Sequence, residues 1–504
     1  MGFSRNGLLF LSQMSTNAIS SKIVMTLFLW GSSRNKFREP SSTMSSNPHV
    51  INLFSTMSHP SSNLSEKQQV ALEKSLNGHN VFITGGAGVG KSFLTKTVVN
   101  GLRDQGQTVR VTASTGVASS LINGQTLHSL LGLGLAQDPV DVLIRRATKN
   151  RKVCQVWRNL DVLVIDEISM VHPVFFEKVS RVVAAIRNQW SEPFGGLQLI
   201  LVGDFYQLPP VPERGQSPTC PKFVFETETW KELNLHCVEL TQIFRQEDDS
   251  EFAQTLRRIR RGELSDGDED MLIDRIHAPI DHAEGVIPTK LHSKRANVSE
   301  LNQKHLMELD GDESKTYEYS VEHSLADGVD VRSAQVKAAM KKYVEEVKAN
   351  SRVEPSVELR VGAQVMMLVN KPDLRLVNGS RGVVIGFDYD MEAGKSYPRV
   401  RFSRTTTVVT PHVWTYSREH VGDVMISQVP LQHAWAVTIH KSQGMTLDCA
   451  EIALDKGVFE YGQAYVALSR VKSLEGVKIV KFQKRVIRAD PKVTEFYNSL
   501  DPNE

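Results

Sequence analysis

A glycine-rich loop that ends in lysine and serine is the first group of residues able to do chemistry. Gly85, Gly90, Lys91 and Ser92 fit the spacing G-x-x-x-x-G-K-[ST]. Glycine lets backbone N–H groups converge on phosphate oxygens, the lysine reaches the β and γ phosphates, and the serine hydroxyl holds Mg²⁺. The loop therefore predicts binding of a nucleoside triphosphate with magnesium. Its expected nucleotide contacts are Gly85, Gly86, Ala87, Gly88, Val89, Gly90, Lys91 and Ser92.

Two carboxylates and an amide follow two later apolar runs of the chain. Asp166 and Glu167 come directly after VLVI, and Gln207 follows LQLILV and Asp204. In doubly wound sheets ligands lie at the carboxyl ends of the strands, so Asp166 would face the metal and Glu167 an attacking water, while Gln207 would sense the γ-phosphate. An Asp-Glu pair after a strand would by itself indicate a helix N-cap, but the phosphate loop favours the catalytic interpretation.

The order of the apolar runs shows which elements must position these residues. Residues 81–84 (VFIT) predict a short buried strand that enters the glycine loop, and FLTKTVVNGL after the loop predicts a helix. Two more apolar strands, within residues 161–170 and 197–211, are separated by helix-compatible stretches. Strands of this kind imply an α/β fold with a parallel sheet and crossover helices.

Composition limits the class of protein without identifying it. The 504 residues are 40% hydrophobic and 23% charged, which suits a globular chain of two to four domains. No apolar run is long enough to cross a membrane, and the four cysteines show no C-x-x-C spacing for zinc or for a disulfide framework. Beyond its basic N-terminal segment the chain is slightly acidic, so nucleic acid would have to bind in a localised basic cleft.

The first 63 residues have the composition of a targeting or disordered segment, and ordered sequence is expected from about Leu64. They combine scattered Lys and Arg with many Ser and Asn, and they contain no acid before Glu39. This pattern favours a mitochondrial transit peptide; a secretory signal is a rival that suits unpaired cysteines poorly. The remaining alternative is a disordered tail, or residues upstream of a later start. The later starts would be Met14, Met25, Met44 or Met57.

Taken together, the motifs resemble those of the Pif family of superfamily-one helicases. The resemblance covers about residues 64–488 and includes GGAGVGKS, VIDEISM and GDFYQLPPV. It also includes LSEKQQ (64–69), ASTGVAS (113–119), LTQIFRQ (240–246), QHAWAVTIHKSQGMTLD (432–448) and GQAYVALSRVKSLEGV (462–477). The family's signature, D-x-x-F-x-x-x-L-x-x-I-R-x-G, is fitted by Asp249, Phe252, Leu256, Ile259, Arg260 and Gly262. A core-packing helix would explain the spacing of the apolar residues equally well, so the resemblance, not periodicity, makes this assignment.

The resemblance implies roles for residues whose spacing alone says little. Gln68 would read the adenine of ATP, and Gly444 would contact the nucleotide. Arg245 and Arg470 would be arginine fingers that neutralise phosphoryl charge once two domains close on ATP. The implied DNA-contacting residues are Thr115, His128, Tyr206, His440, Lys441, Ser442, Gln463, Tyr465, Ser469 and Lys472. Tyr206 and Trp414 could stack on bases, although isolated aromatic residues are more often buried in a core.

The implied architecture is two RecA-like P-loop NTPase domains and a small inserted β-barrel. Residues 64–245 would form the first RecA-like domain, with a small insertion at about 116–154, and residues 246–355 with 428–490 would form the second. Residues 356–427 alternate short β-rich runs with turn signals and would form a Src-homology-3-like barrel. The charged stretch within residues 311–355 suits a solvated helix, and residues 491–504 would be a tail.

The implied activity is that of an ATP-dependent DNA helicase. Such an enzyme would translocate 5′ to 3′ on single-stranded DNA and unwind tailed or forked duplexes in maintenance of the mitochondrial or nuclear genome. It would act as a monomer in solution and would not bind a membrane. The alternative is a DNA-stimulated ATPase that remodels RNA–DNA or protein–DNA complexes without processive unwinding. A catalytically dead clamp is disfavoured because Lys91, Glu167, Arg245 and Arg470 are all present.

Overall fold

The computed structural model of the chain describes residues 64–500, apart from short gaps. The gaps fall at 115–124, 134–135, 137, 211–219, 247–248, 277, 281–286, 311–312, 326–332, 350, 352, 377, 404 and 419–420. Residues 1–63, the expected targeting segment and linker, lie outside the described residues, and so does Thr115, an expected DNA contact. The described residues form a P-loop domain, a second domain with a parallel sheet, and an antiparallel accessory region.

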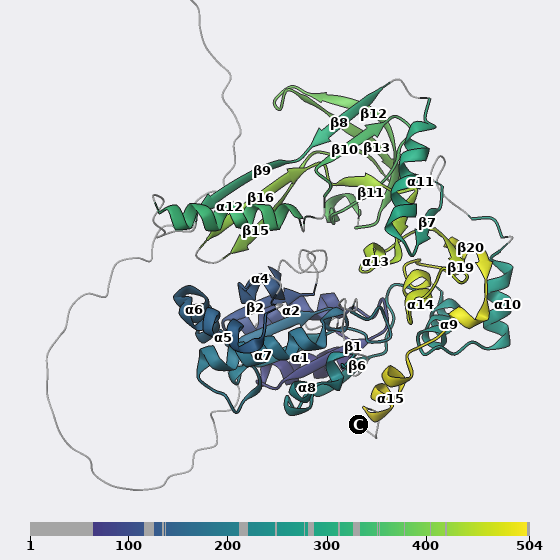
Figure 1. Cartoon of the computed structure of the whole chain (residues 1–504). Helices are drawn as coiled ribbons and strands as arrows, with labels where there is room; N and C mark the ends of the chain where they lie inside the picture. Colours follow the sequence, from purple (N-terminus) through teal and green to yellow (C-terminus); the bar gives the residue numbers. More distant parts are fainter. Residues whose placement is uncertain are drawn as a thin grey trace, which may run out of the picture. The chain divides into compact units, whose positions relative to one another are not determined.

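The P-loop domain is built on a six-stranded sheet in the order β3-β2-β4-β5-β1-β6, with every neighbouring pair parallel. Its strands are β1 (Val81–Gly85), β2 (Val109–Ala113), β3 (Gln125–Thr126), β4 (Val162–Asp166), β5 (Gln198–Val202) and β6 (His236–Leu240). Its helices are α1 (Glu66–Leu76), α2 (Lys91–Asp104), α4 (Leu127–Leu131), α5 (Val140–Lys149), α6 (Arg151–Arg158), α7 (Pro173–Arg187) and α8 (Glu228–Glu232). The central strands β1 and β4 are buried along their whole length, as parallel strands covered by helices on both faces should be (Figure 1). The predicted α/β fold with a parallel sheet is confirmed.

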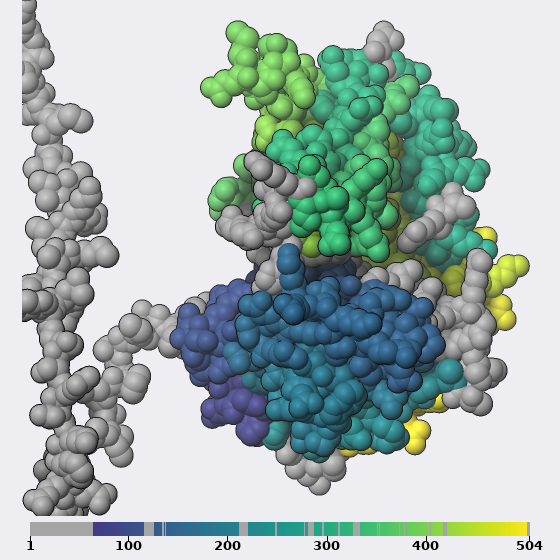
Figure 2. All heavy atoms as spheres, turned by 60° about the vertical axis from the view of Figure 1, so that its left-hand side comes forward, coloured from purple at the N-terminus to yellow at the C-terminus, as the bar shows by residue number. Residues whose placement is uncertain are grey.

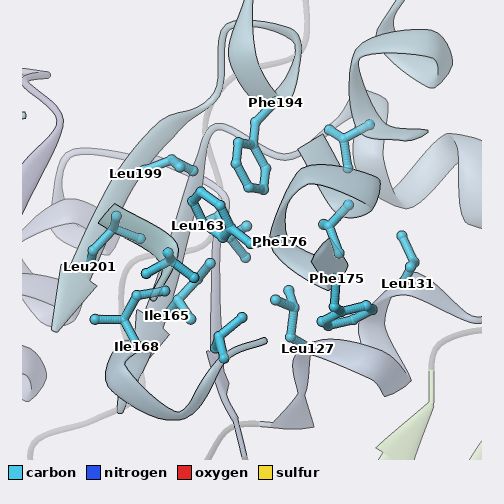
Figure 3. Close-up of a cluster of buried hydrophobic side chains, with 14 of the residues drawn as sticks. Leu127, Leu131, Leu163, Ile165, Ile168, Phe175, Phe176, Phe194, Leu199 and Leu201 are labelled. Carbon is cyan, nitrogen blue, oxygen red and sulfur yellow. The ribbon is translucent and has the colours of Figure 1, made fainter. Parts of the chain in front are cut away.

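Alternate residues of the central strands feed two buried clusters, one on each face of this sheet. On one face, Leu163 and Ile165 of β4 lie in a cluster with Phe175 and Phe176 of α7 and with Phe194 (Figure 3). The cluster on the other face joins the same strands to α2 and includes Ile83, Leu94, Val98, Val164 and Val202. The two clusters fix the strand ends that lead into the glycine loop and the carboxylates.

The second domain has a smaller parallel sheet, ordered β18-β7-β19-β20. Its strands are β7 (Thr289–His292), β18 (Ala436–Thr438), β19 (Ala450–Leu454) and β20 (Val477–Phe482). Its helices are α9 (Ser250–Arg260), α10 (Asp266–Asp274), α11 (Arg295–Met307), α13 (Ile439–Ser442) and α14 (Gln463–Leu468). Strands β7 and β18 are neighbours in the sheet although the accessory region separates them in sequence. The accessory region is therefore an insertion into the second domain.

The accessory region consists of antiparallel strands and one long helix around a shared core. Its elements are β8 (Ser314–Glu318), β9 (Ser320–Leu325), α12 (Ala334–Ala349), β10 (Ser356–Arg360), β11 (Gln364–Met367), β12 (Arg381–Asp390), β13 (Lys395–Phe402), β14 (Thr406–Val408), β15 (His412–Arg418), β16 (Gly422–Gln428) and β17 (Leu431–His433). The sheets are β14-β13-β12-β11-β17, β15-β16-β9 and β10-β8. Helix α12 lies along the second of these sheets (Figure 1).

The accessory region begins earlier in the chain than the sequence pattern predicts. Strand β8 pairs with β10, β9 pairs with β16, and α12 buries Met340, Tyr343 and Val347 in the accessory core. Residues 313–349 therefore do not belong to the second RecA-like domain, and α12 is not simply a solvated helix. The pattern was misleading because most residues of β8 and β9 are exposed, where they form part of the green surface in Figure 2. Strands without an apolar face show no alternation to detect.

Residues 491–499, within the segment predicted to be a tail, form a packed helix. Helix α15 (Pro491–Ser499) follows the N-cap Asp490, with proline at its first position, where a missing N–H costs nothing. Val493 and Tyr497 are buried in the P-loop domain, and Phe496 stacks on Phe225 with ring centroids 4.3 Å apart. The last helix thus belongs to the core of the domain with which the described chain begins.

The described residues contain neither a membrane-spanning helix nor a cluster of metal-binding side chains. No helix there is apolar over the length that a bilayer requires. The same part of the chain holds no group of three or more His, Cys, Asp or Glu side chains placed to bind a metal ion. Its four cysteines form no disulfide.

Candidate nucleotide site

The glycine loop joins the end of β1 to the start of α2. Gly88 and Gly90 both have φ +81°, which glycine adopts without strain, and a Cβ on Gly88 would lie 2.6 Å from that of Arg245. Lys91 Nζ donates hydrogen bonds to the carbonyl oxygens of Gly85 (2.7 Å) and Gly86 (2.9 Å). Burial lowers the pKa of the Lys91 ammonium. The loop is thus shaped for close backbone approach to an anion, with its lysine held at the loop.

A cavity of about 560 Å³ opens at this loop, a volume typical of small-ligand sites. The P-loop domain contributes Ala87, Gly88, Val89, Gly90, Lys91, Ser92, Phe93, Asp166, Glu167, Gln207, Phe244 and Arg245. The second domain contributes Gly444, Thr446, Asp448, Arg470 and Lys472. The accessory region contributes Arg375, Leu376, Ser380 and Ser403. The cavity therefore brings together every residue predicted for catalysis, and most of those predicted for nucleotide contact.

The two carboxylates stand at the end of β4, where the strand pattern predicts them. Burial and the neighbouring Glu167 raise the pKa of Asp166 to about 7. Burial also raises the pKa of Glu167, whose φ of +51° is unusual for a residue other than glycine and is the kind of strain found at functional sites. The hydroxyl of Ser92 and the carboxylate of Asp166 form the all-oxygen donor set that Mg²⁺ prefers. Both residues line the cavity, so their chemistry suits a divalent cation bound with the nucleotide.

Gln443 ties the carboxylates to the second domain. Its Nε2 donates to Glu167 Oε2 (3.1 Å) and to Gln207 Oε1 (3.2 Å). Gln207 in turn lies 3.5 Å from Asp204. Sequence reasoning passed over Gln443, although it stands between Ser442 and Gly444 in a motif already singled out. The contact chain is consistent with the predicted role of Gln207 at the γ-phosphate.

The two expected arginine fingers lie side by side on the cavity wall. Arg245 Nη1 donates to the carbonyl oxygen of Ser469 at 2.9 Å, while Arg470 donates to Ser469 Oγ (2.8 Å) and to the carbonyl of Val466 (2.9 Å). Burial, together with the like charge of Arg470, lowers the pKa of Arg245 to about 9. Two guanidinium groups that both bond neutral oxygens form a site for an anion. Arg470 and Lys91 line the same cavity, as a shared nucleotide would require.

Arg260 of the signature motif forms a second link between the two domains, and its guanidinium is buried. Its guanidinium donates to Asp204 at 3.0–3.2 Å and to Glu239 at 2.6 Å. The Tyr206 ring lies 4.8 Å from this guanidinium and the Tyr497 ring 5.1 Å. Tyr206 is only 4% exposed and stacks on Tyr497. Tyr206 is therefore a core residue in this structure, and its stacking on a base stays a prediction.

Four more of the expected DNA contacts are interior residues. Tyr465 Oη accepts from the backbone N–H of Ala87 at 2.7 Å, so this side chain supports the glycine loop. Gln463 accepts from two backbone amides at the start of α14. Ser442 and Ser469 are no more than 1% exposed and bond within their own helical turns. Trp414, the other candidate for base stacking, is 6% exposed in the accessory core. None of the five side chains faces solvent, where DNA could reach it.

The remaining DNA predictions lie nearer the surface. Lys441 is exposed and His440 half-buried on α13. His128 is half-buried on α4, stacked on Phe175 with ring centroids 3.8 Å apart. Lys472 is exposed too, but it pairs with Asp448 at 2.6 Å on the wall of the nucleotide cavity. Their contact with DNA stays a prediction.

Gln68 is placed behind the glycine loop by an N-terminal capping box. Its side chain accepts from the Ser65 N–H, the Ser65 hydroxyl accepts from the Gln68 N–H, and its Nε2 lies 3.3 Å from the carbonyl oxygen of Val89. At 1% exposure the amide braces the loop. Its predicted contact with adenine is not tested by this arrangement.

The chain is similar in sequence to known helicases over most of its length. Residues 63–270 match a family model described as PIF1-like helicase, and residues 342–387 match one described as DNA helicase Pif1, 2B domain. The ATP-dependent DNA helicase PIF1 of Homo sapiens is 40% identical over 444 residues, which cover 87% of this chain and 64% of the human protein. The ATP-dependent DNA helicase RRM3 of Saccharomyces cerevisiae is 32% identical, covering 84% of this chain and 65% of that protein. The chain thus spans just under two thirds of the length of these relatives.

Solved structures match over nearly their full length. A crystal structure of Pif1 helicase from Candida albicans is 36% identical, with a TM-score of 0.68, covering 87% of this chain and 99% of that chain. A crystal structure of Bacteroides sp Pif1 in complex with ADP-AlF4 is 28% identical, with a TM-score of 0.70, covering 86% and 96%. The similarity extends over the P-loop domain, the second domain and the insertion.

Proposed function

Because the chain belongs to the PIF1-like helicase family, we propose that it is an ATP-dependent DNA helicase that moves 5′ to 3′ on single-stranded DNA and unwinds duplexes in genome maintenance. The observation that carries the proposal is the shared cavity, which Lys91 and Glu167 enter from the P-loop domain and Arg470 from the second domain. A ligand held by two domains changes their arrangement when it binds and leaves.

The cavity residues supply what phosphoryl transfer to water requires. The loop amides and Lys91 bind the β and γ phosphates, while Ser92 and Asp166 would hold Mg²⁺, which neutralises phosphate charge when bound. Glu167 orients the attacking water and accepts its proton. The paired guanidinium groups of the two domains neutralise the charge that develops on the transferred group. An arginine in this role contributes about 10³ to 10⁵ in rate in other nucleotide hydrolases.

Gln443 gives the nucleotide site a physical route to DNA. It contacts Glu167 on one side and directly follows α13 on the other. We assign His440 and Lys441 of α13 to DNA phosphates, together with His128 and Thr115 of the first domain. Contacts of this kind bind without reading sequence and weaken as salt concentration rises.

Unwinding polarity tests the proposal most sharply. The full-length protein is mixed with ATP, Mg²⁺ and duplexes that carry only a 5′ or only a 3′ single-stranded tail. Strand separation is expected with the 5′ tail. Strand separation with the 3′ tail alone would show that the proposed polarity is wrong. ATP hydrolysis without separation of either duplex would favour the alternative, an ATPase that remodels complexes.

The phosphate assignment is tested with a lysine pair on one helix. Lys91→Ala should abolish DNA-stimulated ATP hydrolysis, because it removes the ammonium held at the glycine loop. Lys96→Ala, at an exposed position of α2, is the matched control and should hydrolyse ATP as the wild type does. Equal rates of ATP hydrolysis in the two variants would refute the assignment of Lys91 to the nucleotide phosphates.

Compartment and oligomeric state complete the proposal. The N-terminal composition supports import into mitochondria, with the nucleus as the alternative. A tagged full-length protein that stays diffuse in the cytosol would contradict both. We expect a monomer without DNA, and light scattering after gel filtration would show a larger mass if this is wrong.

A further inference from the structure

The accessory region forms part of the wall of the nucleotide cavity, which the motifs of the sequence do not indicate. Arg375, Leu376 and Ser380, from the loop between β11 and β12, line the cavity that Lys91 and Arg470 also line. Arg375 is exposed, whereas Leu376 is 4% exposed and anchors the loop in the accessory core. The loop thus presents one cation to a space already suited to an anion.

Arg375 is distinguished from the other cations of the cavity because it has no partner within the described part of the chain. Lys472 pairs with Asp448 at 2.6 Å, and Arg245 and Arg470 bond oxygens of the second domain. Among the described residues, by contrast, none accepts a hydrogen bond from the Arg375 guanidinium or forms an ion pair with it. An arginine with a free planar fork on a cavity wall can bind phosphate oxygens through two parallel hydrogen bonds.

The loop holds Arg375 in a constrained position. Its backbone φ is +52°, a left-handed conformation that is uncommon for arginine and that persists where surrounding contacts impose it. Two backbone hydrogen bonds between Lys371 and Leu376, of 2.8 and 3.1 Å, close the loop around it. Further along, Gly379 has φ +96°, and a Cβ there would lie 2.6 Å from the carbonyl oxygen of Thr446. The loop is therefore packed tightly on a segment that itself lines the cavity.

We propose that Arg375 binds the phosphate groups of the nucleotide, so that the accessory region is a third wall of the ATP site. The inference rests on the proposed function, since it takes ATP as the ligand. It adds a contact from the inserted region to those from the P-loop and second domains. Binding and release of ATP then act directly on the accessory region as well as on the cleft between the two parallel-sheet domains.

Fluorescent nucleotide binding tests the proposal in the full-length protein. Methylanthraniloyl-ADP is titrated with Mg²⁺ into the wild type, Arg375→Ala and Arg375→Lys. The alanine variant should bind about tenfold more weakly, as expected for one lost charge-assisted contact. The lysine variant, which keeps the charge but not the fork, should bind about threefold more weakly. Arg399→Ala, whose arginine pairs with Asp388 elsewhere in the accessory region, is the matched control and should bind as the wild type does.

Two outcomes separate this proposal from the assignment of the nucleotide site itself. Binding that is lost in Lys91→Ala but stays within twofold of wild type in Arg375→Ala would overturn the role of Arg375 alone. A wild type that binds no nucleotide would overturn both.

A second variant tests the loop without removing the charge. Gly379→Ala pushes the loop away from Thr446 and should weaken nucleotide binding in the same direction as Arg375→Ala. Circular dichroism checks that this variant is folded. Wild-type affinity in a folded Gly379→Ala would refute the idea that this packing presents the guanidinium.

Discussion

The last helix of the chain places one hydroxyl group where several parts of the P-loop domain meet. Tyr497 Oη shares a 2.6 Å hydrogen bond with Thr84 Oγ1, directly before the glycine loop, and accepts from the backbone N–H of Phe205 at 3.2 Å. It also lies 3.4 Å from Asp204. Tyr497→Phe removes this oxygen alone, since the ring can keep its stacking on Tyr206.

The structure sets the size of the expected loss. Thr84 is fully buried and Phe205 is 2% exposed, so water cannot replace the missing oxygen without a rearrangement. A buried donor or acceptor left without its partner costs about 1–3 kcal/mol. With two such groups affected, we expect Tyr497→Phe to lower the stability of the β1 edge by about 2–6 kcal/mol.

Hydrogen exchange followed by mass spectrometry measures this locally, which matters because a chain of several domains need not unfold in a single step. Peptides that contain β1 and α15 should exchange faster in Tyr497→Phe. The matched control is Tyr389→Phe on β12, where the tyrosine is 63% exposed and the change should have no effect. If the opening free energy of β1 stays within about 0.5 kcal/mol of the wild type, the hydroxyl does not tie α15 to the strand and the reasoning fails.

Two further predictions concern charges. Arg245→Met removes one of two neighbouring guanidinium groups, whose repulsion and burial lower the pKa of Arg245 to about 9. In scanning fluorimetry without nucleotide, we therefore expect the melting temperature of Arg245→Met to be one to a few degrees higher. Its ATPase rate should be at least about 10³-fold lower. A lower melting temperature would show that the two guanidinium groups do not destabilise the fold. Asp268, 2% exposed, has a pKa well below its usual 3.8 because Arg258 and Ser265 donate to its carboxylate. Because its pKa is lower in the folded state, the ionised carboxylate stabilises the fold above its unfolded pKa, and this stabilisation is lost as pH falls. Asp268→Asn should therefore lower the free energy of unfolding by about 1–3 kcal/mol at pH 7. In urea titrations, the difference between variant and wild type should narrow below about pH 4. A deficit independent of pH would refute it.

The catalytic side of the nucleotide site was predictable because its signals are local. A buried strand, a glycine loop and a helix follow one another within residues 81–104, and Asp166 directly ends a second apolar strand. Chain connectivity then dictates that parallel strand ends share one edge of the sheet. The roles of Arg245 and Arg470 needed the family resemblance, since a lone arginine has no spacing to interpret.

Other parts of the site and fold escaped prediction for physical reasons. All six residues of α14 are buried, so no polar face indicates that Tyr465 turns toward the glycine loop. Helix α15 is short, and its packing depends on a few anchors such as Tyr497, too few for a periodic pattern. Arg375 lies in a turn beside the cavity, and this turn packs through Gly379 on Thr446, a contact between segments far apart in sequence.

The contacts between the P-loop domain and the second domain differ in strength, and this difference indicates how the cleft opens. The ion pair of Arg260 with Asp204 is almost completely buried, with exposures of 7% and 0%. Removing either partner would leave the other charge buried without a partner, at a cost of about 3–5 kcal/mol. At the cavity, Gln443 donates to the Glu167 carboxylate and to the Gln207 amide, and Arg245 donates to a backbone carbonyl, contacts of about 1–3 kcal/mol each. This difference predicts that release of the nucleotide separates the Gln443 contacts before the Arg260 ion pair.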